Sequence, residues 1–534
     1  MLLTRRSKVI LNRDVGRRRL AFIRPSRLVL GASAVLLATS FTASVLAADD
    51  YEGDGYAEGT SWKSTGRLDQ FTTYENSTGA VGVYLPNGPV STKDHPFFRP
   101  LGKTGRSCAT CHEPADAMGL STETAQKLWQ SSSGKDPLFA MVDGANCPDL
   151  PANERASHSL LLDRGLIRVA LPWPPRIKTG KPIEPEFSIE VMRDPTGCNS
   201  SSLYGLASKA PKVSVFRKPR ITANLRYVVN LPNDRRYLIN VKTGYALPLD
   251  PDSRSGSLSM NIMSDARLPV LKDQFADAVE THLPGAKKLS SEEMDQLQEF
   301  VLNSYAAQVR DSAAGDLIEK GGPSGLGPFN LAIGESGLGG EHLDTPVFQK
   351  FDQWKATGDN ADPSSEAAFR ASVARGADLF VGRTFFVRDV NHINSIGLGN
   401  PIKRSCALCH NAQMTGHDGA PGWMDIGIAT WPWANNEKDL PLFRLTCRKD
   451  VPPHPYLGRT IYTTDPGRAL ITGRCSDIGS LTMQQLRGLA ARAPYFNNGS
   501  ARTLREVIDF YDRRFNIGYT EQEKQDLVNF LRVL

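Results

Sequence analysis

The stretches SCATCHEP (residues 107–114) and SCALCHNA (residues 405–412) repeat one pattern, C-x-x-C-H, in a chain of 534 residues. Two thiols three positions apart, followed at once by an imidazole, form a compact set of groups that can hold one prosthetic group. The repetition predicts two sites of the same kind. Their residues are Cys108, Cys111 and His112 in the first copy, and Cys406, Cys409 and His410 in the second.

C-x-x-C-H is the attachment signature of c-type haem. The two thiols form thioethers with the vinyl groups of one porphyrin, and the histidine that follows binds the iron. A zinc site made from the two C-x-x-C pairs would leave both histidines unexplained. A thioredoxin-like site would need one C-x-x-C beside a βαβ pattern, which the sequence lacks. We therefore predict two covalently bound haem c groups, with His112 and His410 as proximal iron ligands.

The first 47 residues are predicted to be a signal peptide. Residues 5–27 are basic, residues 28–45 are small or apolar without charge, and Val45-Leu46-Ala47 fits a cleavage site. The apolar run approaches the ~20 residues that span a membrane, so an uncleaved anchor is the alternative. Cleavage is favoured because the run is rich in Ala, Ser and Thr. We expect a periplasmic protein whose mature form is not embedded in a membrane.

The charge of the chain argues against a nucleic-acid partner. The formal net charge is +6, but residues 1–48 contain nine of the basic residues and one acidic residue. The remaining chain has 54 basic and 56 acidic residues. Without the leader there is no excess of positive charge to attract a phosphate backbone. With 40% hydrophobic residues, the chain is long enough for two or three domains.

Four more cysteines follow the motifs as two pairs, Cys147 with Cys198 and Cys447 with Cys475. In an oxidising compartment such cysteines form disulfides. Four cysteines allow three connectivities. We favour 147–198 and 447–475, because each bond then stays within one domain.

The predicted fold is mainly α, with two cytochrome c-like haem domains, the first of which contains a large insertion of loops and strands. The domains cover residues 48–310 and 360–534, and a Gly/Pro-rich linker covers residues 311–359. Within the insertion, residues 188–192 and 212–216 have the pattern of strands. A helix over residues 367–380 is predicted to lead into the second motif.

Similar helical patterns end both halves of the chain. Ser290-x-x-Glu293 and Thr520-x-x-Glu523 are capping boxes followed by apolar residues at helical spacing. Upstream of each box, residues 264–279 and 497–512 have the pattern of a turn followed by a helix. Aligning these two stretches places Leu271 opposite Leu504. Together with the repeated motif, the alignment predicts an internal duplication.

The sequence resembles the bacterial di-haem cytochrome c peroxidases and their relative MauG. The resemblance rests on GADLFVGR (376–383), SCALCHNA (405–412) and LTMQQLRGLAARAPYFNNGSARTLREVIDFYDRR (481–514). It is weaker in HPFFRPLGKTGRSCATCHEP (95–114) and MSDARLPVLKDQ (263–274). It implies a peroxidase-like haem oxidoreductase in which peroxide reacts at the N-terminal haem and the C-terminal haem transfers electrons.

The resemblance also implies a sixth ligand for the C-terminal haem. Peroxidases use a Met on the helix after APYF, and that position here is Tyr511, as in MauG-like enzymes. An anionic oxygen ligand favours ferric iron, whereas the soft sulfur of Met raises the potential. The alternative is that Tyr511 is a core aromatic residue; Met414 and His417 are too close to the second motif to be ligands.

The N-terminal haem is predicted to have a free sixth position. In the alignment of the two halves, Tyr511 falls opposite Ala278, and alanine cannot bind iron. His158 is an alternative ligand that would close this position.

In the peroxidases a Gln and a Glu help to cleave the peroxide O–O bond as acid and base. The corresponding positions here are Ile262 and Lys272. Asp273 and Gln274, which follow Lys272, are candidates to take over this role. Asp265 and Arg267 keep the D-x-R pattern of the family. The candidate catalytic residues are therefore Asp273, Gln274, Asp265 and Arg267.

Two alternative functions remain open at this point. A cleft lined by Ile262 and Met263 would suit an apolar substrate, as in the rubber-cleaving di-haem oxygenases that bind dioxygen. A non-catalytic electron carrier would instead need two six-coordinate irons. The expected partners are hydrogen peroxide or dioxygen, together with a small electron-donor protein or a substrate protein. The resemblance also implies a calcium ion held largely by backbone carbonyls.

Overall fold

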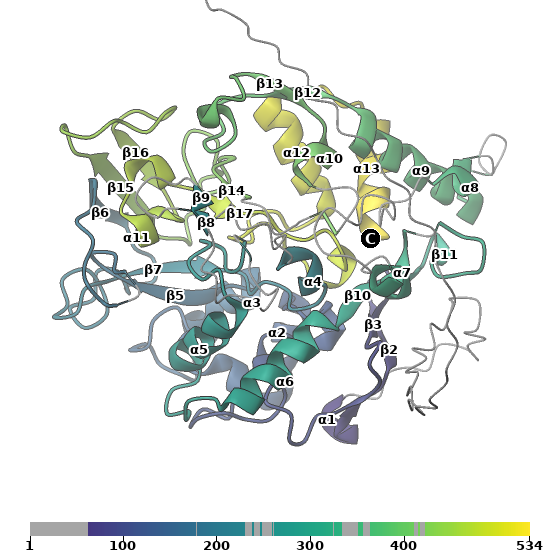
Figure 1. The fold of residues 1–534 in the computed structure, drawn as a ribbon, viewed down its shortest axis with the longest axis horizontal. Helices are drawn as coiled ribbons and strands as arrows, with labels where there is room; N and C mark the ends of the chain where they lie inside the picture. Colours follow the sequence, from purple (N-terminus) through teal and green to yellow (C-terminus); the bar gives the residue numbers. More distant parts are fainter. Residues whose placement is uncertain are drawn as a thin grey trace, which may run out of the picture. The chain divides into compact units, whose positions relative to one another are not determined.

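Two consecutive helices lie toward the end of each half of the chain (Figure 1). In the first half they are α5 (Leu271–His282) and α6 (Ser291–Leu302), and in the second half α12 (Leu504–Phe515) and α13 (Glu521–Arg532). Each helix has 12 residues, and α6 and α13 both begin with a complete capping box. The helices predicted from the sequence are confirmed.

This computed structural model describes residues 62–177, 179–229, 238–239, 246–247, 259, 261–323, 325–333, 351–355, 362, 364–410, 415–416 and 422–534. They belong to one compact unit, Tyr51–Leu534. The predicted signal peptide, Met414 and His417 lie outside the described residues. The domain boundaries drawn from the sequence stay a prediction. No helix in the described part of the chain is long and apolar enough to cross a bilayer.

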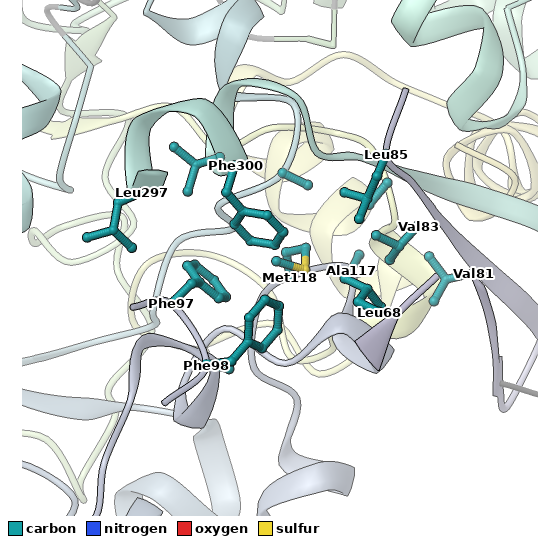
Figure 2. Close-up of a cluster of buried hydrophobic side chains, with 14 of the residues drawn as sticks. Leu68, Val81, Val83, Leu85, Phe97, Phe98, Ala117, Met118, Leu297 and Phe300 are labelled. Carbon is teal, nitrogen blue, oxygen red and sulfur yellow. The ribbon is translucent and has the colours of Figure 1, made fainter. Parts of the chain in front are cut away.

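Each helix pair packs on an aromatic residue that precedes its haem motif. In the second half this residue belongs to α9 (Glu366–Gly382). Phe300, the tenth residue of α6, lies 4.7 Å from Phe97 between ring centroids, within the cluster of Figure 2. Phe530, the tenth residue of α13, lies 5.4 Å from Phe380 of α9. The equivalent packing supports the predicted duplication.

The close approach of α9 to α13 depends on a glycine in the GADLFVGR stretch. A Cβ atom added at Gly376 would lie 2.0 Å from the backbone oxygen of Asp526. No real Cβ contact is that short, so only glycine lets the two helices meet at this point. The predicted helix over residues 367–380 is part of α9 and is confirmed.

A four-stranded antiparallel sheet lies in the first half and was not predicted. Its order is β11-β10-β3-β2, with β2 (Phe71–Asn76), β3 (Gly79–Tyr84), β10 (Tyr305–Asp311) and β11 (Gly315–Asp316). The β2–β3 hairpin precedes the first motif, whereas β10 directly follows α6. The sheet therefore joins the start of the haem region to its end.

The predicted strands of the insertion are also confirmed. β7 (Lys212–Arg217) pairs with β5 (Ile167–Pro172), and β6 (Phe187–Arg193) pairs with β15 (Leu442–Cys447). β15 also pairs with β16 (Thr460–Thr463), on its other edge. The inserted segment is thus hydrogen-bonded to a strand that follows the second motif, about 250 residues away in sequence.

The prediction of a mainly α fold is right only in part, because strands form a substantial share of the structure. Many strands are short and pair over long sequence distances, so they leave a weaker sequence signal than capped helices. The remaining helices and strands that the structure describes are α1 (Trp62–Thr65), β1 (Arg67–Leu68), β4 (Val90–Ser91), α2 (Thr122–Ser132), α3 (Ser159–Arg164), α4 (Leu225–Val228), β8 (Leu238–Ile239), β9 (Ala246–Leu247), α7 (Gly327–Ile333), α8 (Asp352–Lys355), β12 (Phe385–Val387), β13 (Ile402–Arg404), α10 (Cys406–Cys409), β14 (Trp423–Met424), α11 (Ala469–Thr472) and β17 (Leu481–Thr482).

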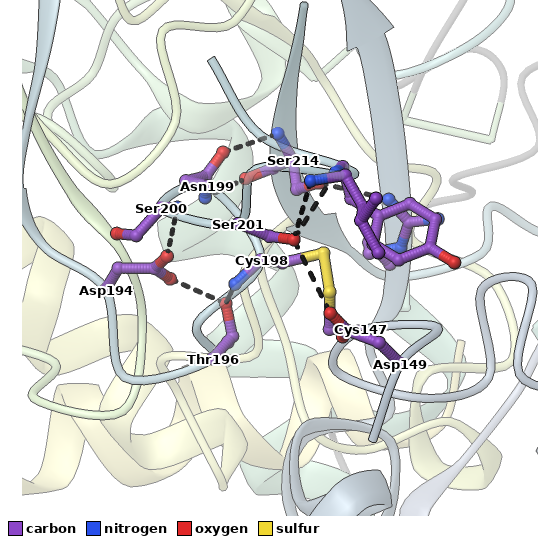
Figure 3. Close-up of a disulfide and its surroundings, with 12 residues drawn as sticks. Cys147, Asp149, Asp194, Thr196, Cys198, Asn199, Ser200, Ser201 and Ser214 are labelled. Carbon is purple, nitrogen blue, oxygen red and sulfur yellow. Dashed lines mark hydrogen bonds between the residues drawn. A yellow bond between two sulfur atoms is a disulfide. The ribbon is translucent and has the colours of Figure 1, made fainter. Parts of the chain in front are cut away.

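Both predicted disulfides are present, Cys147–Cys198 and Cys447–Cys475. The first lies beside a loop that folds around Asp194, whose carboxylate accepts hydrogen bonds from Thr196 (2.7 Å) and the Ser200 amide (2.8 Å) (Figure 3). The second ties the end of β15 to the turn after α11. Each bond fixes a loop that follows its own haem motif.

Candidate haem sites

The first C-x-x-C-H motif lies on the wall of a large cavity. A short 3-10 turn, Cys108–Thr110, begins after Ser107 and places Cys108, Cys111 and His112 on this wall. The cavity has an empty volume of about 1530 Å³, counting the part open to solvent. We call it the N-cavity.

The second motif lies on the wall of a matching cavity of about 1550 Å³, the C-cavity. α10 positions Cys406 and Cys409, and His410 follows directly at its end. Phe380 of α9 lies 6.3 Å from the His410 ring between centroids, as Phe97 lies 6.4 Å from His112. Both candidate proximal histidines therefore sit beside an equivalent aromatic residue.

The two cavities are lined by equivalent positions of equivalent helices. The predicted alignment, with Leu271 opposite Leu504, brings five lining residues of α5 into register with five of α12, at the spacing of one helix face. Two residues of α6 likewise match two of α13. The pairs are Leu271/Leu504, Gln274/Val507, Phe275/Ile508, Ala278/Tyr511, His282/Phe515, Leu297/Leu527 and Val301/Leu531.

Burial keeps the anchoring groups in neutral forms. It raises the pKa of Cys108 and of Cys406 to about 12, and that of Cys111 to about 11. Burial, and to a lesser extent nearby His282, lowers the pKa of His112 to about 4. A neutral imidazole is the form that binds a metal.

The ring of His410 is oriented by the backbone. Burial lowers its pKa, and its Nδ1 atom lies 3.3 Å from the carbonyl oxygen of Gly416. A ring nitrogen held by a carbonyl carries the proton, which leaves the other nitrogen as the metal ligand. The Nε2 atom of His410 is therefore the one suited to iron.

Buried cations on the cavity walls fit the two carboxylates that every haem carries. Lys218 lines both cavities, Arg220 lines the N-cavity and Arg492 lines the C-cavity. Burial, with the nearby Arg492 charge as a second cause, lowers the pKa of Lys218 to about 7 and that of Arg220 to about 9. Burial alone lowers that of Arg492 to about 10. Anionic groups in the cavities would stabilise these charges, so the residues present fit haem.

The two cavities share part of one wall. Lys218, Pro219, Gln484 and Gln485 line both of them. Asn497 holds this wall, because its carbonyl accepts from the Lys218 amide (2.8 Å) and its side-chain oxygen accepts from Gln484 (2.5 Å). Groups bound in the two cavities would thus be separated by a thin layer of protein.

Tyr511 lies in the C-cavity with His410, as the resemblance implied. Its ring centroid is 6.2 Å from that of Phe515 and 6.3 Å from that of Phe496. Burial, and then the neighbouring thiols of Cys406 and Cys409, raise the pKa of the Tyr511 phenol. Its role as an iron ligand stays a prediction.

His158 is held as a structural residue. It is fully buried, and its Nδ1 and Nε2 atoms lie 2.8 Å and 2.9 Å from the carbonyl oxygens of Gly144 and Ala152. It is absent from the described residues that line the N-cavity. The alternative in which His158 closes the sixth position therefore has no support from its geometry.

The four candidate catalytic residues divide into two groups. Gln274 and Arg267 line the N-cavity, together with Ile262 and Met263. Asp273 lies on α5, but it is not among the described residues that line this cavity. Asp265 is not among them either. Their catalytic role stays a prediction, and the geometry favours Gln274 and Arg267.

Asp265 instead belongs to a buried ion-pair network. It accepts from Arg217 (2.5 Å) and Arg267 (2.9 Å), and Arg217 also contacts Asp465 (2.7 Å). Burial by itself would raise the pKa of Asp265, but Arg267 and Arg217 outweigh it and lower this pKa to about 2. The network links the insertion, the D-x-R turn and the segment after β16.

The lowered pKa of Asp265 predicts a pH dependence of stability. The carboxylate stabilises the fold fully above its unfolded pKa near 4, and this stability is lost as the pH falls through the folded pKa near 2, below which the carboxyl is protonated in both states. We expect the free energy of unfolding at pH 7 to be larger for wild type than for Asp265→Asn. The difference between the two free energies should narrow by about 2 kcal/mol as the pH falls from 5 to 2. Denaturant midpoints across this range measure it. Asp277→Asn, which alters a more exposed partner of Arg267, should show little change, and a gap that does not vary with pH would contradict the assignment.

Sequence reasoning missed His282, which lines the N-cavity at the last position of α5. A signal was available, because His282 follows Ala278 by four residues and therefore lies on the same helix face. It also missed Arg106 and Arg217, which line the same cavity.

No protein-family model matches the chain. Among curated proteins, the chain is similar to the cytochrome-c peroxidase IdrP1 of Pseudomonas sp. (strain SCT), with 30% identity over 148 residues, which are 25% of this chain and 37% of the relative. IdrP1 of Denitromonas iodatirespirans is 28% identical over 197 residues, which are 34% of this chain and 44% of the relative. IdrP2 of the same organism is 30% identical over 141 residues, which are 25% of this chain and 36% of the relative.

The predicted resemblance to the cytochrome c peroxidases is therefore confirmed by these relatives. The chain spans less than half the length of these relatives. Two solved structures overlap with it at 15% identity: hydrazine synthase of Kuenenia stuttgartiensis, over 60% of this chain and 73% of that one, and a MauG-like protein associated with microbial copper homeostasis, over 68% and 92%. Their TM-scores of 0.25 and 0.26 are too low to establish a shared fold.

Proposed function

We propose that this chain is a periplasmic di-haem c oxidoreductase that reduces hydrogen peroxide in the N-cavity, with electrons supplied through the C-cavity. The carrying observation is an asymmetry between two otherwise equivalent cavities. At matching positions α12 presents Tyr511 and α5 presents Ala278. One cavity therefore offers a sixth iron ligand from this helix position and the other does not.

Haem, when bound, would supply iron for the reaction with peroxide and for electron transfer. The residues that would hold it are the four motif cysteines, with His112 and His410 on the iron and Tyr511 as a further iron ligand in the C-cavity. Lys218 and Arg492 offer positive charge to the haem carboxylates. Gln274 and Arg267 line the N-cavity wall, and the Gln274 amide would donate a hydrogen bond to a small oxygen-containing substrate.

The shared wall supports electron transfer between the cavities. Lys218, Pro219, Gln484 and Gln485 belong to both linings, so the separation is one layer of side chains there. The electrons would come from a small donor protein, or from a substrate protein oxidised at the surface. The periplasmic location rests on the predicted leader. A calcium ion stays a prediction from the family resemblance.

The proposal is tested by stopped-flow absorbance of the purified diferric protein mixed with stoichiometric hydrogen peroxide. We expect a fast change in the Soret band, followed by its return when a reduced cytochrome or chemical donor is added and oxidised. Free haemin at the same iron concentration is the control for haem chemistry outside the fold. No Soret change over minutes would contradict peroxide reduction.

A dioxygen-dependent oxygenase is the second candidate, favoured by Ile262 and Met263 on the N-cavity wall. These side chains suit an apolar organic substrate better than peroxide alone. An oxy-complex that persists in the reduced protein would favour this candidate. A reduced protein that binds neither dioxygen nor carbon monoxide would exclude it and favour the third possibility, an electron carrier.

A further inference from the structure

His282 is a titratable side chain on the α5 face of the N-cavity, and the equivalent position in the C-cavity carries an apolar residue. It ends α5, one helical turn after Ala278. At the equivalent position α12 has Phe515. Gln274, on the same face of α5, is likewise matched by Val507. The helix face that carries Tyr511 in one cavity thus carries Gln274 and His282 in the other.

A buried carboxylate holds the His282 ring. The Nδ1 atom contacts Oδ2 of Asp143, which is 4% exposed, and the other oxygen of Asp143 accepts from the buried guanidinium of Arg106. Arg106 is itself fixed by the carbonyls of Pro137 (2.7 Å) and Leu138 (2.6 Å). The hydrogen-bonded row Arg106–Asp143–His282 is therefore fixed at its Arg106 end by backbone carbonyls.

The charge state of Asp143 decides the proton on His282. Burial by itself would raise the pKa of Asp143, but Arg106 and the His282 hydrogen bond outweigh it, so this pKa lies below its usual value. An ionised carboxylate accepts a hydrogen bond, so Nδ1 of His282 carries the proton. Nε2 is then the ring nitrogen that does not contact Asp143, and the His282 side chain lines the N-cavity.

We propose that His282 is the distal acid–base residue of the N-cavity, oriented by Asp143 and Arg106. This inference rests on the proposed function for its substrate, hydrogen peroxide. Overall, H2O2 takes up two electrons from the donor protein and two protons, and gives two molecules of water. The O–O bond breaks more easily when one group accepts the proton from the attacking oxygen and returns it to the departing oxygen. His282 supplies that group where Ile262 and Lys272 replace the family's Gln and Glu; Lys272 pairs with exposed Asp295.

Cyanide binding tests this role without any peroxide turnover. At neutral pH cyanide arrives as HCN and must give up its proton as it binds ferric iron, so a distal base accelerates its association. We expect His282→Gln to slow cyanide association, followed by the Soret change, by about 10²- to 10⁴-fold. Asp143→Asn should slow it less, because the imidazole remains but its orientation and tautomer are no longer fixed. Haem content, measured as two per chain, confirms that each variant is assembled.

The chain offers a matched control in His392, whose Nε2 atom lies 2.8 Å from buried Asp477 but which is absent from the described residues lining either cavity. His392→Gln should bind cyanide at the wild-type rate. If His282→Gln also binds at that rate, the proposal is overturned. If wild type shows a low-spin N-haem in electron paramagnetic resonance that becomes high-spin in His282→Gln, His282 is an axial ligand and the acid–base role is likewise overturned. If His282→Gln binds cyanide more slowly than wild type, but wild type does not react with peroxide, the role of His282 is upheld and the peroxidase proposal is rejected.

Discussion

Replacing Cys406 and Cys409 together with alanine is expected to leave one covalently bound haem per chain instead of two. The same result is expected for Cys108 and Cys111, because each motif pair lines its own cavity. Without thiols no thioether can form, so the effect is a complete loss at one site rather than a weakened affinity. The haem-to-protein ratio from alkaline pyridine spectra, and the intact mass of the chain, both measure it.

The disulfide cysteines provide the matched control for this experiment. Replacing Cys147 and Cys198 with serine removes two cysteines but leaves both motifs intact. It should cost roughly 2–5 kcal/mol of stability and leave two haems attached. If either motif variant retained two covalent haems, the assignment of that motif as an attachment site would be wrong.

The second large effect is expected at Tyr511. If Tyr511 is the sixth ligand in the C-cavity, Tyr511→Phe removes it and leaves one iron five-coordinate or bound to water. Electron paramagnetic resonance of the ferric protein should then lose the low-spin signal of one haem. Tyr511→Met should restore six ligands but raise the reduction potential of that haem, because a thioether favours ferrous iron where a phenolate favours ferric iron.

Tyr495→Phe serves as the control for Tyr511, because Tyr495 also lines the C-cavity. Its hydroxyl donates to the Leu489 carbonyl (3.1 Å), so its removal costs a hydrogen bond without touching the iron. This variant should keep the wild-type spectrum and potentials. An unchanged low-spin signal in Tyr511→Phe would show that Tyr511 is a packing residue, as Phe510 beside it is.

The outcome at the N-cavity depends on groups that no local pattern could bring together. Arg106, Asp143 and His282 are spread over 176 residues, and their contact follows from packing α5 against the loop after α2. The sequence alignment of the halves correctly placed Ala278 opposite Tyr511, but it compared single positions and so passed over His282. His158 was considered because it follows the first motif in sequence, yet its ring is bound to backbone carbonyls.

The sequence by itself determined the local helices, and it predicted the chemistry of attachment. The C-x-x-C-H motif consists of three residues within one turn, and a capping box with an apolar face lies within one helix. Both can therefore be recognised from the sequence without the tertiary structure. The disulfide pairing was also predictable, because each bond then stays within one predicted domain. Tertiary structure alone decided the sheet built from β2, β3 and β10, the pairing of β6 with β15, and the shared wall at Lys218 and Gln484. These features join residues far apart in the chain, and the energy that selects them comes from burial and backbone hydrogen bonding between segments, which no short stretch of sequence encodes.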